Sequence, residues 1–259
     1  MKVLAIANQK GGVGKTSVAV NLSATLAHYG QRVLLVDLDP QGNATTGSGV
    51  DKNGVEKSIY DVLLGECSVI DARAQAVGGY ELLAANRELA GAEIELIEMP
   101  RREFRLKEAL VPVADDYAFV VIDCPPALNM LTVNALTAAD SVIIPMQCEY
   151  YALEGLSDLV GTLRKVKANL NPKIEIEALV RTMYDPRSAL TNQVSDEIKS
   201  HFGDKVFNTV IPRNIRIAEA PSFGKPVILH DPASKGAIAH FAFARELLTR
   251  QGVAFKEAA

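Results

Sequence analysis

Three observations predict an α/β fold for this chain, with a doubly wound, mostly parallel sheet flanked by helices. Seven apolar runs of strand length occur near residues 2–8, 32–37, 80–84, 118–123, 141–145, 174–183 and 206–211. Helix-like segments separate most of these runs, an alternation that is typical of parallel sheets. The chain has 259 residues, 48% of them hydrophobic, and no linker or low-complexity tract. We therefore expect one domain, residues 1–259, with a large core.

A glycine-rich loop follows the first strand-like run. Its sequence, KGGVGKT at residues 10–16, stands between the apolar residues 3–7 and a helix-like run at residues 17–26. Glycines let backbone N–H groups curl around phosphate oxygens, because a Cβ would block the required angles or the close approach. We expect a phosphate-binding loop, although similar turns also occur without any nucleotide. The expected nucleotide-contacting residues are Lys10, Gly11, Gly12, Val13, Gly14, Lys15, Thr16 and Ser17.

Two side chains of this loop have the chemistry of a nucleotide site. Lys15 is placed to reach the β- and γ-phosphates, and the Thr16 hydroxyl is placed to ligate Mg²⁺ where a helix begins. Lys10 is an additional lysine, and the glycine spacing departs from the common GxxxxGK[ST] pattern. The motif is therefore a deviant Walker A sequence of a P-loop NTPase.

Carboxylates follow the second strand-like run and the fourth. Asp37 and Asp39 end the first of these, and Asp123 ends the other in the manner of a Walker B aspartate. Ligands bind at the carboxyl ends of strands in doubly wound sheets, so we expect all three near the phosphates. Asp123 should hold Mg²⁺ through water, together with Thr16 and Asp39. A single aspartate at a strand end is more often a cap or turn residue, but three behind one phosphate loop favour the site.

Four segments resemble one known family. KGGVGKT, DLDPQGNAT, IDCPP and IPRNIRIAEAPSFGKPV are similar to sequences of the ParA/Soj partition ATPases, the deviant-Walker-A group that also contains MinD and the nitrogenase iron protein. The resemblance covers about residues 2–250. It implies a weak ATPase that uses ATP and Mg²⁺, forms a sandwich homodimer with ATP, and binds double-stranded DNA non-specifically. It also implies a ParB-type centromere-binding partner that stimulates hydrolysis, and a cytoplasmic, nucleoid-associated location.

The resemblance also implies roles for single residues of the phosphate site. Lys10 would reach across a dimer interface to the other subunit's nucleotide, as an arginine finger does. Lys15 would serve its own site, and Asp39 would orient or activate the attacking water. Gly12 matches a position where close approach of two subunits leaves no room for a side chain. Chemistry alone would allow either Asp37 or Asp39 to face the water.

Further residues are implied for the base and for DNA. Pro212 and Arg213 fall in the segment that runs alongside adenine in this family, and a ring and a guanidinium plane suit stacking. Arg187 and Arg216 align with arginines implicated in non-specific DNA binding. From spacing alone, either arginine could equally be the partner of a surface salt bridge.

Charge is spread unevenly along the chain, whose net charge is −4. Residues 1–180 hold 16 Lys and Arg against 23 Asp and Glu, whereas residues 181–259 hold 11 against 8. Several cations on one face would bind phosphates without reading sequence. The cations available for such a surface are Arg181, Arg187, Lys199, Lys205, Arg213, Arg216, Lys225 and Lys235. Basic residues within 101–110 favour a solvated helix face instead.

A membrane-associated positioning ATPase is one alternative, because MinD relatives end in a basic amphipathic helix. Residues 251–259 hold one aromatic and one lysine, which makes a poor anchor. In the preceding helix, residues 235–250, we expect the stripe of Ile238, Phe241, Ala242, Ala244 or Arg245, and Leu248 to face the core. No apolar run approaches the length of a membrane span, and no signal peptide is expected.

An ATP-coupled metabolic or redox enzyme of the same fold is the other alternative. A shared iron–sulfur cluster would need suitably placed cysteines. Cys67, Cys124 and Cys148 show no metal-ligand spacing and are odd in number, so we expect reduced cysteines, with Cys124 buried as packing.

Overall fold

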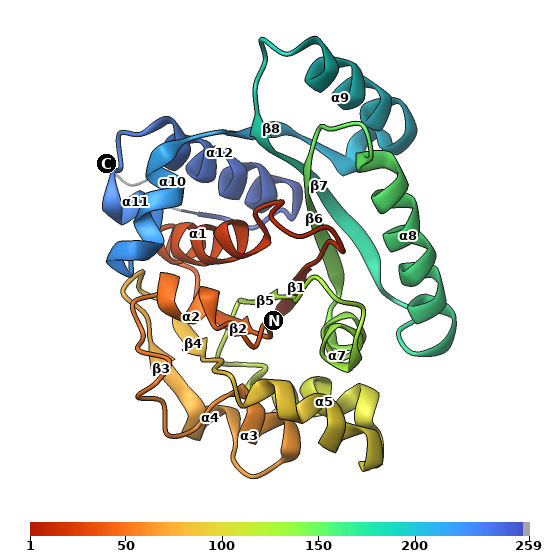
Figure 1. Cartoon of the computed structure of the whole chain (residues 1–259). Coiled ribbons are helices and arrows are strands. Elements are labelled where there is room, and N and C mark those ends of the chain that lie inside the picture. Colours follow the sequence, from red (N-terminus) through yellow and green to blue (C-terminus); the bar gives the residue numbers. More distant parts are fainter. Residues whose placement is uncertain (256–259) are drawn as a thin grey trace.

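The computed structural model describes residues 1–255 and contains one eight-stranded sheet, shown in Figure 1. The strand order is β3-β4-β2-β5-β1-β6-β7-β8, and only the β3–β4 pair is antiparallel. The strands are β1 (Lys2–Ile6), β2 (Val33–Asp37), β3 (Arg73–Gln75), β4 (Glu81–Leu83), β5 (Phe119–Asp123), β6 (Ser141–Gln147), β7 (Glu175–Tyr184) and β8 (Val206–Pro212). The predicted fold class is confirmed. All seven predicted strands are present, and the edge strand β3 is an addition.

Helices cover both faces of the sheet (Figure 1). One face packs against α1, α11 and α12, and the other packs against helices that include α3, α5, α7 and α8. The helices are α1 (Lys15–His28), α2 (Asn43–Gly47), α3 (Ile59–Leu64), α4 (Val69–Ala72), α5 (Leu89–Glu98), α6 (Arg105–Leu110), α7 (Met130–Ala138), α8 (Ala152–Asn169), α9 (Ala189–Phe202), α10 (Ile215–Glu219), α11 (Val227–His230) and α12 (Lys235–Arg250).

Alternation along the strands explains the two apolar layers. In β1, Leu4 and Ile6 point into the layer beneath α1, while Val3 and Ala5 point into the opposite layer. Successive side chains of a strand face opposite sides of its sheet, so a strand covered on both sides reads as a continuous apolar run. This is why the sequence predicts the central strands so clearly.

Strand register brings the predicted carboxylates to one edge. Asp37 at the end of β2 lies opposite Asp123 at the end of β5. Asp123 also lies opposite Ile6, the last residue of β1. The loops that follow these three strands therefore leave the sheet side by side, at its carboxyl edge.

Helix α12 forms where the sequence predicts it, but the expected buried stripe is partly wrong. Ile238 is 56% exposed and Phe241 is only half-buried, whereas Leu248 is fully buried. Ala244, also in the predicted stripe, is buried. The buried face further includes, at helical spacing, Ala237 and His240, each one position before Ile238 and Phe241, together with Phe243 and Leu247.

The predicted helix at residues 101–110 is divided. Arg101 has a left-handed backbone, a 3-10 turn follows at Arg102–Phe104, and α6 begins at Arg105. Arg101 pairs with Glu108 at the surface, in line with a solvated charged face. Arg105 donates instead to the carbonyl of Leu63, in the last turn of α3.

The chain end and the cysteines bear on the two alternatives. Phe255 packs against Tyr29 with ring centroids 5.2 Å apart. The rest of the predicted terminal segment, residues 256–259, lies outside the described residues. Among residues 1–255 no helix is long and apolar enough to cross a bilayer. Cys124 and Cys148 are buried, Cys67 is half-buried, and all three are free thiols.

Candidate nucleotide-binding site

The loop between β1 and α1 has the backbone that a phosphate cradle requires. Gly12 and Gly14 have φ angles of +74° and +89°, a left-handed conformation that L side chains rarely adopt. Gly14 caps α1 without a side-chain hydrogen bond, so the first N–H groups of this helix point into the loop unpaired by a cap. Such a helix start attracts anions through its free N–H groups and its dipole.

Distant residues hold this loop in place. The Thr182 hydroxyl donates to the Val13 carbonyl at 2.8 Å. The Asn8 side chain donates to the Pro145 carbonyl at 2.8 Å and accepts from the Lys10 N–H at 2.9 Å. Neither Asn8 nor Thr182 is among the site residues predicted from the sequence. No short motif could have signalled Thr182, which stands 169 positions from its partner.

The two lysines of the loop lie in different environments. Lys15 is buried, with its Nζ 3.3 Å from the Lys10 carbonyl. Burial lowers the pKa of Lys15, and the nearby Asp123, Cys124 and Asp39 oppose that effect. Lys10 extends into solvent and pairs with Glu149, its Nζ 2.6 Å from the carboxylate oxygen. Only Lys15 is therefore positioned to serve the phosphate cradle of its own chain.

Asp37 is fully occupied by contacts within the chain. Its Oδ2 accepts hydrogen bonds from the Thr45 N–H and hydroxyl, both at 2.8 Å, and its Oδ1 accepts from the Asp39 N–H at 3.1 Å. The Thr45 hydroxyl in turn accepts from the Ala85 N–H at 2.9 Å. Burial raises the pKa of Asp37 to about 6. Asp37 therefore anchors the loop after β2 and is not free to face a water molecule.

Asp39 is the more available of the two carboxylates after β2. It is half-buried, and its Oδ1 accepts from the Gln41 N–H at 3.0 Å. The loop then turns at Gly42, which has a φ of +62°. A Cβ there would lie 2.6 Å from the Ala85 carbonyl oxygen, so only glycine fits. The geometry thus separates Asp37 and Asp39, which the sequence left equivalent.

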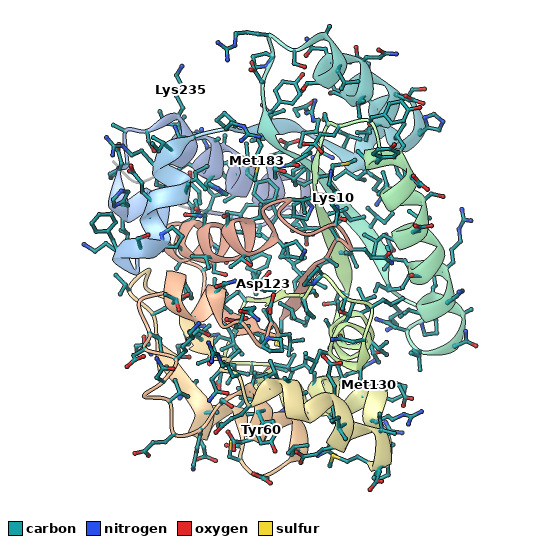
Figure 2. The ribbon with its side chains drawn as sticks, in the orientation of Figure 1. Lys10, Tyr60, Asp123, Met130, Met183 and Lys235 are labelled. Atoms are coloured by element: carbon teal, nitrogen blue, oxygen red, sulfur yellow. The ribbon has the colours of Figure 1, made fainter. Side chains whose placement is uncertain are left out.

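Asp123 is buried without compensation. Among the residues that the structure describes, neither of its carboxylate oxygens has a hydrogen-bond partner. Burial, and next the Asp37 carboxylate, raise its pKa well above the ordinary value, while Thr16 and Lys15 act in the opposite direction. A buried carboxylate without partners is costly unless a cation or water completes it. Figure 2 shows Asp123 at the centre of the molecule and Lys10 on the loop that leads to α1.

The donor set fits Mg²⁺ held largely by water and phosphate. Within residues 1–255 no three His, Cys, Asp or Glu side chains gather closely enough to hold a metal by themselves. Mg²⁺ commonly keeps several waters and takes one or two protein ligands plus phosphate oxygens. Asp123 and Thr16 could supply these protein ligands, with Asp39 near the same edge.

A pocket of about 190 Å³ opens beside the phosphate loop. The predicted base-contacting residues, Pro212 and Arg213, lie in its wall. Its lining is Gly14, Ser17, Val18, Thr182, Met183, Ile211, Pro212, Arg213, Asn214, Ile217, Ala218 and His240. Met183 has a φ of +48°, an uncommon backbone for a residue other than glycine that is often found at functional sites. The pocket joins the start of α1 to the end of β8, as a site for phosphates and a base would.

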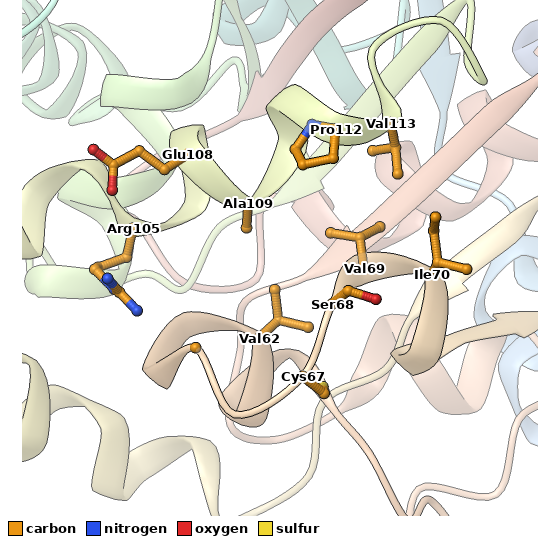
Figure 3. Close-up of a pocket in the computed structure, with 11 residues that line it drawn as sticks. Val62, Cys67, Ser68, Val69, Ile70, Arg105, Glu108, Ala109, Pro112 and Val113 are labelled. Atoms are coloured by element: carbon orange, nitrogen blue, oxygen red, sulfur yellow. The ribbon is translucent and has the colours of Figure 1, made fainter.

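A second pocket of about 190 Å³ lies between α4 and α6, away from the carboxyl edge of the sheet. Figure 3 shows Val62, Cys67 and Val69 on one side and Ala109, Pro112 and Val113 on the other. None of the predicted site residues lines it.

The arginines predicted to contact DNA are exposed, and both are paired with carboxylates. Arg187 contacts Asp185 through two nitrogens, each at 2.9 Å. Hydrogen bonds from Arg187, with a contribution from Arg213, lower the pKa of Asp185 to about 2. Arg216 pairs with Glu219 and Asp231.

One predicted surface cation is wrong. Arg181 is only 3% exposed and donates to the Ser195 hydroxyl at 2.9 Å and to the carbonyls of Phe207 and Asn208 at 2.6 and 3.0 Å. These acceptors lie on the neighbouring β8 and on α9, so Arg181 is an internal crosslink. The other seven cations of the predicted set are exposed.

A doubly wound sheet whose first strand leads through a deviant Walker A loop into a helix defines a P-loop ATPase. The family model described as an AAA domain matches residues 1–176. The sporulation initiation inhibitor protein Soj of Bacillus subtilis is 55% identical over 247 residues, which are 95% of this chain and 98% of Soj. The chromosome partitioning protein ParA of Caulobacter vibrioides is 51% identical over 254 residues, 97% of this chain and 95% of that protein. The chain belongs to the ParA/Soj family of chromosome-partitioning ATPases.

A solved structure shows the same fold. A crystal structure from Mycobacterium smegmatis, described as cobyrinic acid a,c-diamide synthase with bound ADP and magnesium, has a TM-score of 0.86 and 39% sequence identity. The match covers 97% of this chain and 95% of that chain.

Proposed function

We propose that this chain works as a nucleotide-controlled DNA-partitioning switch within a single domain, residues 1–259. It binds ATP and Mg²⁺, forms a sandwich homodimer, and coats double-stranded DNA without reading sequence. Hydrolysis stimulated by a ParB-type partner then releases it, and repeated cycles move a chromosome or plasmid. The observation that carries this proposal is the contrast within one loop between buried Lys15 and outward-facing Lys10.

ATP and Mg²⁺ binding is supported by the buried Asp123 carboxylate, which accepts no hydrogen bond from the described residues, and by the glycine-rich loop before α1. Lys15 would neutralise the β- and γ-phosphates, and Thr16 with Asp123 would hold the ion, which supplies charge neutralisation when bound. The M. smegmatis relative contains ADP and magnesium. Pro212 and Arg213 would then flank adenine in the adjoining pocket.

A homodimer is supported by the surface around Lys10. The Lys10–Glu149 pair is exposed, so separating it costs only about 1 kcal/mol or less. Tyr150 and Tyr151 follow directly and are strongly exposed for aromatic residues. A second copy seated on this face would cover the tyrosines and draw Lys10 toward its own nucleotide. Gly12 adds no side chain to the interface, and a Cβ there would meet no atom of its own chain.

Hydrolysis requires a positioned water, and Asp39 is the residue that we assign to it. Asp37 accepts a hydrogen bond from the Asp39 N–H and so fixes the backbone from which the Asp39 carboxylate extends. Asp39 retains an oxygen for which no hydrogen bond is seen among the described residues. Water orientation and charge neutralisation are the main contributions that proteins make to phosphoryl transfer.

DNA binding is supported by exposed cations near the base pocket. Arg187 and Arg213 both act on Asp185, and Arg216 lies on the next helix. Their carboxylate partners are at the surface, where phosphates can compete for them at little cost. Lys225 and Lys235 are exposed and could add further phosphate contacts. Binding of this kind weakens steeply with salt, because each neutralised phosphate releases counterions.

Two other functions are disfavoured by specific observations. A lipid-binding end is disfavoured because Phe255, the aromatic residue of the terminal segment, packs on Tyr29. A metabolic synthase is suggested by the description of the M. smegmatis structure, but that chain is 39% identical, whereas the partition relatives are 51% and 55% identical.

The test is binding to random-sequence DNA with ATP, with ADP and without nucleotide, at two salt concentrations. We expect binding with ATP alone, weakened by salt and equal for unrelated sequences. Arg216→Glu should lose DNA binding and keep dimerisation, with Lys165→Glu, at an exposed position on α8 outside the predicted set of cations, as a control for charge alone. A dimer that does not bind DNA in any nucleotide state would contradict the proposal. Liposome binding would then indicate a membrane-associated ATPase, and a small-molecule substrate would indicate a metabolic enzyme.

A further inference from the structure

Helix α5 exposes two large apolar side chains. Leu89, Ala92 and Leu96 form its buried face. Ile94 is 73% exposed and Ile97 is 56% exposed. Three residues apart on a helix, they share one side and present a continuous aliphatic ridge to solvent. Figure 1 shows α5 at the edge of the molecule beside α7 and far from α12.

The same helix carries a net negative charge. Glu88 precedes α5, and Glu93, Glu95 and Glu98 lie on it, with no Lys or Arg between positions 88 and 98. Ion pairs in the neighbouring segment, Arg101–Glu108 and Arg102–Glu103, involve none of these four glutamates. Within the described residues, Glu95 accepts from the Tyr60 hydroxyl, and Glu88 and Glu93 accept from the side-chain amides of Asn86 and Asn129.

A hydrogen bond ties this helix to the Mg²⁺ edge of the site. The Asn129 side chain donates to Glu93 and also caps α7, accepting from the Thr132 N–H at 3.0 Å. Asn129 ends the loop that begins after Asp123. Leu128, directly before it, is 52% exposed. Figure 2 shows the start of α7, at Met130, next to α5.

We propose that Ile94, Ile97 and Leu128, with Glu93, Glu95 and Glu98 around them, form the docking surface for a cationic amphipathic segment of the hydrolysis-stimulating partner. We call these residues the acidic–apolar surface. The identity of its partner rests on the proposed function, whereas the surface itself does not. Aliphatic side chains of the segment would cover the isoleucine ridge, and its Lys or Arg side chains would meet the glutamates.

Charge complementarity is the reason to choose this occupant. Four glutamates outnumber the neighbouring Arg102, whose Nη1 donates to the Ile97 carbonyl at 2.8 Å. A ridge with this net negative charge repels acidic chains and membrane surfaces, and it speeds association with a basic segment. The location explains why binding could alter hydrolysis. A segment lying over Ile97 and Leu128 touches the loop that carries Asp123, so it can bias the position of the Mg²⁺ ligand.

The experiment uses the full-length chain and the purified ParB-type protein of the same cell. Partner-stimulated ATP hydrolysis and direct binding are measured for Ile97→Lys and Glu98→Lys. Ile238→Lys is the matched control, because Ile238 is also 56% exposed but lies on α12. We expect both α5 variants to reduce stimulation and binding by about tenfold or more, as interface substitutions of this kind do. Basal hydrolysis, dimerisation and DNA binding should stay at wild-type levels.

The outcomes separate this surface from the proposed function. If the partner stimulates the wild type and both α5 variants equally, the acidic–apolar surface is not its site, and the partition switch stands. An equal loss in Ile238→Lys would also overturn the assignment. If the partner fails to stimulate even the wild type while DNA binding follows ATP, partner-driven release fails, and this surface loses its occupant with it.

Discussion

The ends of β2 and β5 carry two buried aspartates directly opposite one another, and the protein treats them differently. Asp37 accepts three hydrogen bonds from Thr45 and Asp39, whereas Asp123 accepts none from the described residues. A buried charge that the chain satisfies fully has a structural role. A buried charge without hydrogen-bond partners in the chain needs a bound cation or water to compensate it.

Removing the unsatisfied charge should give the largest effect. Asp123→Asn should lower ATP hydrolysis by about 100- to 1,000-fold, because the variant loses the negative ligand that holds Mg²⁺. The free energy of unfolding without nucleotide should be unchanged or higher, because an uncompensated buried carboxylate is gone. Hydrolysis assays and denaturant melts of the same preparation measure both. A marked loss of stability would show that Asp123 has partners within the chain.

Removing a partner of the satisfied charge should destabilise the fold instead. Thr45→Val should lower the free energy of unfolding by about 2–3 kcal/mol, since a buried carboxylate and the Ala85 N–H both lose a partner. Thr137→Val is the control, because Thr137 is also fully buried but its hydroxyl has no partner among the described residues. The control should be neutral or slightly stabilising in urea melts. Equal losses in the two variants would contradict the role given to Asp37.

The pH dependence of the free energy of unfolding also tests the role of Asp37. The pKa of Asp37 is raised from 3.8 to about 6, so between these pH values the folded chain keeps a proton that the unfolded chain has lost. The free energy of unfolding of the wild type should therefore fall, relative to Asp37→Asn, by up to about 1.4 kcal/mol per pH unit as pH rises through this window. Buried His240, with its pKa lowered to about 3, acts in the opposite direction in both proteins and so cancels from the comparison. Burial, the largest cause, raises the pKa of Asp123 in both proteins, so the difference between them belongs to Asp37 and to its coupling with Asp123. Melts of both proteins at pH 4, 5 and 6 test this, and parallel curves would refute it.

Replacing Lys10, the exposed lysine of the phosphate loop, should have the smallest effect on folding. Lys10→Ala should change the free energy of unfolding by less than about 1 kcal/mol, because its ion pair with Glu149 is solvent-exposed. ATP-dependent dimerisation, followed by light scattering, should nonetheless be impaired. Intact dimers and normal hydrolysis would remove Lys10 from the role in trans.

Much of the fold could be predicted from the sequence, because strands buried on both faces are continuous apolar runs. β3 was not predicted, because it is a short, largely polar edge strand of Arg73, Ala74 and Gln75. The orientation of α12 was predicted only in part, because its buried face runs through Ala237 and His240 and leaves Ile238 exposed.

The site was predictable to the extent that its residues lie in short motifs. The phosphate loop and the strand-end aspartates are of this kind. The distinction between Asp37 and Asp39 depends on Thr45 and Ala85. The phosphate loop is held by a hydrogen bond from the Thr182 hydroxyl. The burial of Arg181 depends on β8 and α9. Such contacts between distant segments leave no local pattern, because the folded backbone alone brings them together.

The pocket beside the phosphate loop is built from segments far apart in the chain, which matters during synthesis. β1 and the phosphate loop leave the ribosome before β5 and β6, the strands that pair with β1, which follow more than 110 residues later. The pocket beside the loop closes only with Pro212 and His240. A nascent chain thus has an unpaired apolar strand until β5 has been synthesised, a period when chaperones protect such segments from aggregation. It acquires the pocket only after β8 and α12 have followed, so ATP cannot guide the early steps of folding.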